Sequence, residues 1–229
     1  MLELKAINQY YGESHTLRDV NLSVPKGSCI CLMGRNGVGK TTLLKALMGL
    51  LPIASGSVTF EGKEFGKLPA EARARNGIAY VPQGRDIFPL LTVEENLQVG
   101  MSAAKVRKVP DLVFELFPVL KTMLRRRGGD LSGGQQQQLA IGRALVLGPK
   151  LMILDEPTEG IQPNIVHEIG DIIMRLNREQ GLTVLLVEQK IAFARRVGQR
   201  FCILDKGHSV ATGAMSELSE SLINQHLRV

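Results

Sequence analysis

A glycine-rich loop that ends in Lys and Thr has the residue types that bind nucleotide phosphates: Gly34-Arg35-Asn36-Gly37-Val38-Gly39-Lys40-Thr41-Thr42. Its glycines let backbone N–H groups turn inward onto phosphate oxygens, and the positive end of a following helix would point at the same oxygens. Lys40 is expected to reach the β- and γ-phosphates, and Thr41 to bind Mg²⁺ through its hydroxyl. The loop therefore predicts a site for a nucleoside triphosphate.

Two adjacent carboxylates, Asp155 and Glu156, follow the apolar run Leu151-Met152-Ile153-Leu154. The Asp155 carboxylate at the end of a buried strand would be desolvated unless it meets a cation, and Mg²⁺ held through Thr41 supplies one. Glu156 lies one residue further on, where it could polarise a water for attack in line with the leaving phosphate. The pair therefore predicts a metal ligand followed by a general base.

A serine and two glycines, Ser132-Gly133-Gly134, precede Gln135 at the start of a predicted helix. The Ser-x-x-Gln pattern is typical of a capping box, so by itself it indicates a well-formed helix start. The same hydroxyl and glycine amides could also form a second anion site on another surface of the molecule. Two phosphate-binding sites on one chain favour a dimer that closes around ATP.

Short strands are predicted to position the phosphate loop. The runs Leu2–Ile7, Val20–Val24 and Cys29–Met33 are rich in branched residues and are separated by turn residues. The third run leads directly into the phosphate loop, and Lys40–Leu50 then carries leucines at helical spacing. This order of strand, glycine-rich loop and helix is the one that a phosphate site requires.

The rest of the chain predicts an α/β core with a helical insertion. A hairpin at 58–62 and the strand Ile78–Val81 come first, and the pattern then turns helical from Gly84 to about Lys150. Beyond it, the apolar runs at 151–154, 184–187 and 201–204 alternate with amphipathic segments at 163–177 and 190–197.

Composition limits the function classes. The chain has 229 residues, a net charge of +6 and 4% aromatic residues, and its basic residues are dispersed apart from Arg125-Arg126-Arg127, which disfavours nucleic acid as a partner. No apolar run approaches the ~20 residues of a spanning helix, and the N-terminus lacks the features of a signal peptide, so a cytosolic location is expected. Cys29, Cys31 and Cys202 lie in apolar runs and are expected to be buried free thiols.

Taken together, the phosphate loop, Asp155-Glu156 and Leu131-Ser132-Gly133-Gly134-Gln135-Gln136-Gln137 resemble the motifs of the ATPase subunits of ABC transporters. This resemblance covers nearly the whole chain. It implies a P-loop NTPase core of the ABC type, with an N-terminal antiparallel β part and a helical insertion subdomain. It places the core at residues 1–83 and 150–229, and the helical subdomain at 84–149, in one ABC ATPase domain.

The family resemblance also implies further site residues. Gln83 matches the glutamine that links Mg²⁺ to the helical insertion, and Tyr11 matches the aromatic residue that stacks on adenine, although Tyr10 is adjacent. Ser132, Gly133, Gly134 and Gln135 would bind the γ-phosphate of ATP held by the opposite subunit. The implied assembly is a head-to-tail dimer with a second ATPase subunit, identical or paralogous, that uses ATP and Mg²⁺.

Less general motifs look like those of the second ATPase subunit of bacterial urea importers, within the branched-chain amino-acid importer group. Among them are Tyr10–His15, Gln83–Pro89 and Glu156–Pro163. The expected function is therefore to power a urea importer, with an importer of branched-chain or other amino acids as the alternative. A non-transport ABC ATPase fits less well, because such proteins usually carry two ATPase units or long coiled-coil insertions.

The implied partners are transmembrane permease subunits at the cytoplasmic side of the membrane and, indirectly, an external solute-binding protein. The segment Gly84–Gly100 is the candidate for permease contact, with Phe88 and Pro89 as exposed apolar residues; internal packing of these two is the alternative.

Two positions depart from the general family pattern: Gln189 stands where most members have a switch histidine, and Gln162 where many have an aspartate. Gln189 can hydrogen-bond a γ-phosphate but cannot carry positive charge.

Overall fold

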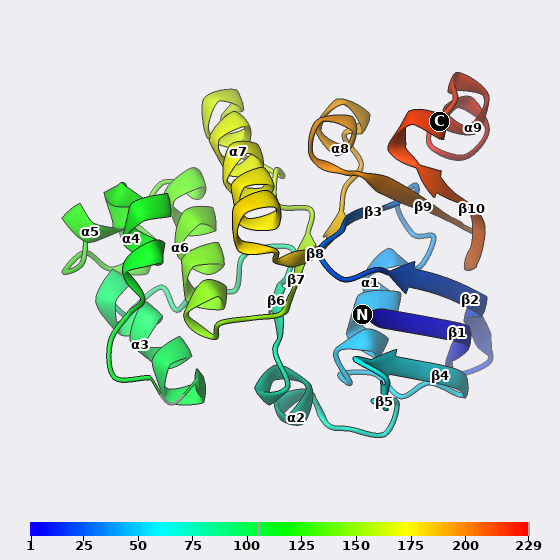
Figure 1. The fold of residues 1–229 in the computed structure, drawn as a ribbon, viewed down its shortest axis with the longest axis horizontal. Helices are drawn as coiled ribbons and strands as arrows, with labels where there is room; N and C mark the ends of the chain where they lie inside the picture. Colours follow the sequence, from blue (N-terminus) through cyan, green and yellow to red (C-terminus); the bar gives the residue numbers. More distant parts are fainter. Residues whose placement is uncertain (105, 229) are drawn as a thin grey trace.

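The computed structural model describes residues 1–104 and 106–228, and its strands form two sheets (Figure 1). The smaller sheet is antiparallel, with the strand order β2-β1-β4-β5. Its strands are β1 (Leu2–Tyr11), β2 (Ser14–Val24), β4 (Ser55–Phe60) and β5 (Lys63–Glu64). This sheet is the N-terminal antiparallel part that the family resemblance implies.

The larger sheet has the order β10-β9-β3-β8-β7-β6, and all its pairs are parallel except β9 with β10. Its strands are β3 (Cys29–Met33), β6 (Ile78–Val81), β7 (Leu151–Asp155), β8 (Thr183–Val187), β9 (Arg200–Asp205) and β10 (His208–Ala214). Because β3, β6, β7 and β8 run in the same direction, their carboxyl ends meet at one edge of the sheet. The phosphate loop, Gln83, Glu156 and Gln189 follow these strand ends.

Helices cover the larger sheet and also form a separate group beside it. In Figure 1, α3 to α6 gather at one side, α7 lies between them and the sheets, and α1 lies between the two sheets. The helices are α1 (Lys40–Leu47), α2 (Ala70–Arg75), α3 (Val93–Ala104), α4 (Asp111–Leu116), α5 (Pro118–Thr122), α6 (Gly133–Val146), α7 (Pro163–Gln180), α8 (Ile191–Val197) and α9 (Glu220–His226). Two 3₁₀ turns span Gly128–Asp130 and Met215–Glu217.

Both faces of the larger sheet are buried, which explains why its central strands are continuously apolar. Along β3, Cys29, Cys31 and Met33 point into one hydrophobic core, which contains residues of α6 and α7. Ile30 and Leu32 point into a second core with the leucines of α1 and the smaller sheet. The predicted buried free thiols at Cys29, Cys31 and Cys202 are confirmed.

The predicted strands and helices are present, with differences at their ends. The first strand is longer than predicted and continues to Tyr11. The first helix ends at Leu47 rather than Leu50, since Gly49 has a positive φ of 73° and the buried Arg73 guanidinium donates to the carbonyls of Ala46 and Leu47. Within the described residues, no helix has both the length and the apolar character needed to cross a bilayer.

Candidate nucleotide site

The phosphate loop joins the end of β3 to the start of α1. Gly39 is the N-cap of α1 with a φ of 106°, a conformation that favours glycine, and no side chain in the described chain caps the N-terminal end of this helix. The first N–H groups of α1 are therefore left for an external acceptor such as a phosphate oxygen. A cavity of about 360 Å³ lies at this end, lined by Thr16, Asn36, Gly37, Gly39, Lys40, Thr41, Thr42, Gln83 and Glu156.

Lys40 is buried beneath this cavity, with 5% of its surface exposed. Its Nζ donates to the carbonyl oxygens of Gly34 at 2.9 Å and Arg35 at 2.8 Å, and it lies 3.7 Å from Glu156 Oε1. Burial lowers the pKa of Lys40, and the carboxylates of Glu156 and Asp155 oppose that shift. The arrangement holds a desolvated cation at the floor of an otherwise polar cavity, where it can attract anionic oxygens.

Asp155, at the end of β7, is a buried carboxylate with incomplete hydrogen bonding. It is 2% exposed; Oδ2 accepts from the Tyr80 hydroxyl at 3.3 Å, whereas Oδ1 has no hydrogen-bond partner among the described residues. Burial raises the pKa of Asp155 to about 6, and burial next to this carboxylate also raises the pKa of Tyr80. An unpartnered buried carboxylate oxygen is costly, and a bound cation would compensate for it.

These residues fit Mg²⁺. The described residues contain no group of three His, Cys, Asp or Glu side chains placed to hold a metal ion. Mg²⁺ at nucleotide sites requires no such group, because one or two protein oxygen ligands are completed by phosphates and waters. Asp155 and the hydroxyl of Thr41, in the first turn of α1, are oxygen ligands of this kind.

Glu156 lies at the centre of a hydrogen-bond network between three loops. Its backbone has a φ of 49°, and its N–H donates to the Val187 carbonyl at 2.9 Å. Gln189 Nε2 donates both to Glu156 Oε1 at 2.5 Å and to Asn36 Oδ1 at 2.7 Å. The structure thus brings Lys40, Glu156 and Gln189 together, as their predicted roles require.

Gln83, at the end of β6, reaches the same group of residues. Its Nε2 donates to Glu159 Oε2 at 2.8 Å and approaches Glu156 Oε2 at 3.5 Å. Glu159 and Tyr80 were not identified from the sequence. The alternation of β6 could have indicated that Tyr80 points to the same face of the sheet as Ile153 and Asp155 of β7, but the turn that brings Glu159 to Gln83 has no such periodic signal.

Ser132, Gly133, Gly134 and Gln135, here called the signature residues, lie at a different cavity. Ser132 caps α6, its Oγ accepting from Gln135 N at 3.4 Å while Ser132 N donates to Gln135 Oε1 at 2.9 Å, so the predicted capping box is confirmed. A cavity of about 190 Å³ lies there, lined by Ser132, Gly133, Gly134, Gly160, Gln162 and Ile165. None of these residues lines the phosphate cavity. One chain therefore carries two separate cavities, which are the candidate half-sites.

The segment after Gln83 is fastened to α6. Arg85 Nη1 donates to Gln136 Oε1 at 3.1 Å, and Arg143 Nη2 donates to the Asp86 carbonyl at 2.6 Å. The Arg143 guanidinium also lies 5.2 Å from the ring centroid of Phe88, whose exposed fraction is 44%. Phe88 and Pro89 are exposed, as the sequence predicted for a contact with the permease. Leu90, which the sequence did not single out, is even more exposed, to 79%.

The two candidate adenine-stacking residues differ in their surroundings. Both rings are about equally exposed, Tyr10 to 46% and Tyr11, at the end of β1, to 48%. The Tyr10 ring, however, stacks on His15 with centroids 4.1 Å apart. An exposed ring without a stacking partner inside the described chain is available for a base. The preference for Tyr11 remains a prediction.

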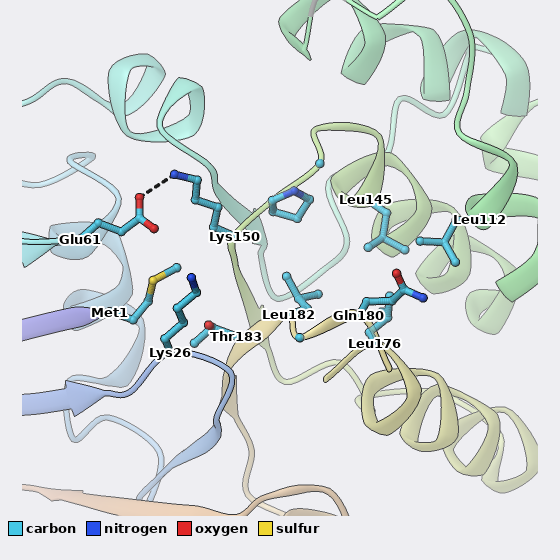
Figure 2. Close-up of a pocket in the computed structure, with 13 residues that line it drawn as sticks. Met1, Lys26, Glu61, Leu112, Leu145, Lys150, Leu176, Gln180, Leu182 and Thr183 are labelled. Atoms are coloured by element: carbon cyan, nitrogen blue, oxygen red, sulfur yellow. Dashed lines mark hydrogen bonds and ion pairs between the residues drawn. The ribbon is translucent and has the colours of Figure 1, made fainter. Parts of the chain in front are cut away.

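A larger cavity, of about 510 Å³, lies at the opposite edge of the sheet, where β7 and β8 begin. Figure 2 shows its lining, with the ion pair of Glu61 and Lys150 at 2.6 Å on one side and Leu112, Leu145 and Leu182 on the other. The phosphate loop, Asp155 and Glu156 contribute nothing to it. It is therefore not part of the candidate nucleotide site.

Known proteins agree with this fold. The family model described as ABC transporter matches residues 17–159. The high-affinity branched-chain amino acid transport ATP-binding protein BraG of Pseudomonas aeruginosa is 46% identical over 219 residues, 93% of this chain and 94% of that protein. A probable branched-chain amino acid transport ATP-binding protein, LivF of Archaeoglobus fulgidus, is 38% identical, covering 96% of this chain and 94% of the relative.

Among solved structures, a dimeric bacterial ABC transporter cassette matches with a TM-score of 0.83 and 28% identity, covering 94% of this chain and 99% of that one. The predicted fold class is confirmed. The chain belongs to the ABC transporter family, and it is an ATPase.

Proposed function

We propose that this chain is the ATP-hydrolysing subunit of an importer for branched-chain amino acids. The names of the relatives BraG and LivF support this alternative over the urea importer that the sequence motifs favoured, since neither is named for urea. The structural observation that carries the ATPase part is the contact of Lys40 and of Gln189 with Glu156, which lines the phosphate cavity, while the signature residues lie at another cavity.

At the phosphate cavity, each residue has a proposed task. The backbone N–H groups of the phosphate loop and α1 bind phosphate oxygens, and Lys40 turns from the loop carbonyls to the β- and γ-phosphates. Glu156 orients the attacking water and takes up its proton, while Gln189 donates an uncharged hydrogen bond to the γ-phosphate. The exposed ring of Tyr11 stacks on adenine.

Asp155, Thr41 and Gln83 would hold Mg²⁺, whose chemistry is to neutralise charge on the phosphates. The orphaned Oδ1 of Asp155 supports this role most directly. Gln83 would also connect the ion to the helical subdomain, because the Gly84–Asp86 stretch that follows it is bonded to α6 through Arg85 and Arg143.

The signature residues would serve a second ATPase subunit. Cassettes of this family work as dimers with transmembrane permease subunits. We propose a head-to-tail dimer in which Ser132, Gly133, Gly134 and Gln135 of one subunit contact the γ-phosphate at the other subunit's phosphate loop. The separate cavities within one chain support this arrangement, and a symmetric partner could be an identical or a paralogous subunit.

The helical subdomain, with proposed bounds at residues 84–149, would face the permease at the cytoplasmic side of the membrane. The exposed Phe88, Pro89 and Leu90 within Gly84–Gly100 form its candidate contact. An external solute-binding protein would act only through the permease. Nucleic acid is not a proposed partner.

Reconstitution with the permease and binding protein in liposomes tests this function. ATP turnover should rise with leucine, isoleucine or valine, and should not respond to urea or glutamate. The isolated chain should be indifferent to all of these solutes, because a ligand shifts an equilibrium only through different affinities for its two states. Stimulation by urea alone would favour the urea importer instead. Saturable binding of a solute to the isolated chain would contradict the proposal that the permease and the binding protein recognise the solute.

A further inference from the structure

Glu188 is a buried carboxylate that the proposed chemistry does not use. It follows β8, directly before Gln189, and is 2% exposed. Three donors converge on it: Oε1 accepts from the backbone N–H groups of Gln189 at 2.8 Å and Lys190 at 2.9 Å, and Oε2 accepts from the Thr158 hydroxyl at 2.8 Å. Such a fully bonded, desolvated anion fixes the groups that surround it.

Those donors belong to the two loops that carry Glu156 and Gln189. Thr158 lies two residues after Glu156 and is 1% exposed. A second tie runs in parallel, because Lys190 Nζ donates to the Thr158 carbonyl at 2.9 Å. The backbone joins the loops once more, through Glu156 N donating to the Val187 carbonyl at 2.9 Å. Glu188 therefore connects the start of the loop after β7, which carries Glu156, to the start of the loop after β8, which carries Gln189.

The two N–H groups bound by Glu188 set the direction in which the chain leaves β8. Gln189 itself is exposed, and its side chain reaches Glu156 and Asn36 from this point. An exposed glutamine has several rotatable bonds, so its position depends on a fixed backbone. Without the acceptor at Glu188, both N–H groups would be released. The backbone from which the Gln189 side chain extends would then no longer be held in place.

We propose that Glu188 is a positioning residue, which holds Gln189 against Glu156 by tying the turn after β8 to Thr158. The inference rests on the proposed role of Gln189 in hydrolysis. It assigns no contact between Glu188 and the nucleotide. Its effect passes through the orientation of Gln189 alone, and that restriction is what separates it from a general contribution to folding.

A double-mutant cycle on the full chain tests whether Glu188 acts only through Gln189. Glu188→Ala should lower kcat about 10-fold while changing the KM for ATP less than about 3-fold, because the phosphate loop stays intact. In the Gln189→Ala background, the same substitution should produce no further fall in kcat. A fall of the same size in both backgrounds would overturn the inference, since Glu188 would then act independently of Gln189.

Substitutions at Thr158 keep the test decisive if Glu188→Ala folds poorly. Thr158→Val removes the hydroxyl donor at nearly constant shape, and Thr158→Ser retains it. Turnover should fall several-fold in the first, on the order of one charge-assisted hydrogen bond, and stay near the wild-type value in the second. Equal turnover in both variants would overturn the tie between the loops.

The single variant Gln189→Ala separates this inference from the proposed mechanism. A wild-type kcat in that variant would remove Gln189 from hydrolysis, and with it the reason for positioning it. A reduced kcat together with additive effects in the cycle would leave the mechanism standing and overturn only the role of Glu188.

Discussion

The two half-sites of this chain differ in how far each is completed by the chain's own residues. At the phosphate cavity, Glu156 is approached by Lys40 at 3.7 Å, Gln83 at 3.5 Å and Gln189 at 2.5 Å. At the signature cavity, the Ser132 hydroxyl accepts only from the N–H of Gln135 within the described chain. The first site is organised before ATP arrives, whereas the second consists of a helix start with an open hollow beside it.

This difference indicates which interactions belong to one chain and which to an assembly. In the proposed mechanism, binding of the phosphates and polarisation of water would use residues whose geometry is fixed within one chain, as preorganised catalytic sites require. The glycine amides and hydroxyl of the signature would acquire a partner only when a second subunit brings its nucleotide. Substitutions at the phosphate cavity and at the signature cavity should therefore have different effects.

The largest effect is expected at Glu156. Glu156→Gln should keep ATP binding but lower kcat by about 100-fold or more, because the amide cannot take up a proton while the phosphate cavity is unchanged. ATP and Mg²⁺ should then hold the variant as a dimer, visible by size-exclusion chromatography. Normal turnover in this variant would remove Glu156 from the role of general base.

A substitution at the signature should leave binding to the single chain intact. Ser132→Asp preserves a good N-cap but places a negative charge where the partner's γ-phosphate is expected, so closure with ATP should weaken by about 10-fold or more. The neutral Ser132→Asn caps equally well and is the matched control. Sedimentation with ATP measures closure, and calorimetry measures binding. Weakened binding by the isolated Ser132→Asp chain would contradict the separation of the half-sites.

A substitution at Gln189 tests its proposed hydrogen bond to the γ-phosphate. Gln189→Ala should lower turnover about 10-fold by removing one hydrogen bond to a charged group. Because an amide does not titrate, the shape of the pH profile between pH 6 and 8 should stay the same, which steady-state assays can measure. A wild-type rate would mean that Gln189 has no part in hydrolysis, and an altered profile would mean that it affects a titrating group.

The smallest effect concerns the stability of the metal-free chain. The pKa of Asp155 is raised to about 6 by burial, so the folded state binds this proton more tightly than the unfolded state does. Stability from this group is present below the unfolded pKa and is lost as the pH rises through about 6. Relative to Asp155→Asn in EDTA, the wild-type free energy of unfolding should fall by about 1–2 kcal/mol from pH 4.5 to 7.5, allowing for solvent screening.

Urea unfolding of both proteins across this pH range measures the difference. Added Mg²⁺ with nucleotide should then stabilise the wild type more than Asp155→Asn. A difference that is independent of pH would contradict the assignment of the shift to Asp155.

The sequence was sufficient to predict the residues that follow parallel strands. Apolar runs predicted the strands that end at or next to Met33, Val81, Asp155 and Val187. The phosphate loop and Glu156 were recognised as the residues after two of these strands, whereas Gln83 and Gln189 came from the family resemblance. Fully buried strands are readable because their apolar character is continuous and their length is short.

Contacts made by irregular segments were not predictable in the same way. Glu159 on Gln83 and Glu188 on Thr158 join two loops, and Arg85 on Gln136 joins a loop to α6. The paths of these loops depend on the packing of the whole molecule. The early end of α1 has the same origin, since Arg73 caps it from 26 residues away. The transported solute was not predictable from the residues assigned to the nucleotide, because the sequence motifs and the named relatives favour different substrates.

Mixing two inactive variants tests the head-to-tail assembly most directly. Lys40→Ala disables the phosphate loop, with the exposed Lys45→Ala on the same helix as a control, and Ser132→Asp disables the signature. Each inactive variant alone should hydrolyse ATP at a small fraction of the wild-type rate. In an equal mixture, half of the dimers would be mixed and each would keep one intact site, so turnover should recover to about a quarter of the wild-type rate. No recovery on mixing, with an active wild type, would contradict the account that each ATP is held between the phosphate loop of one subunit and the signature of the other.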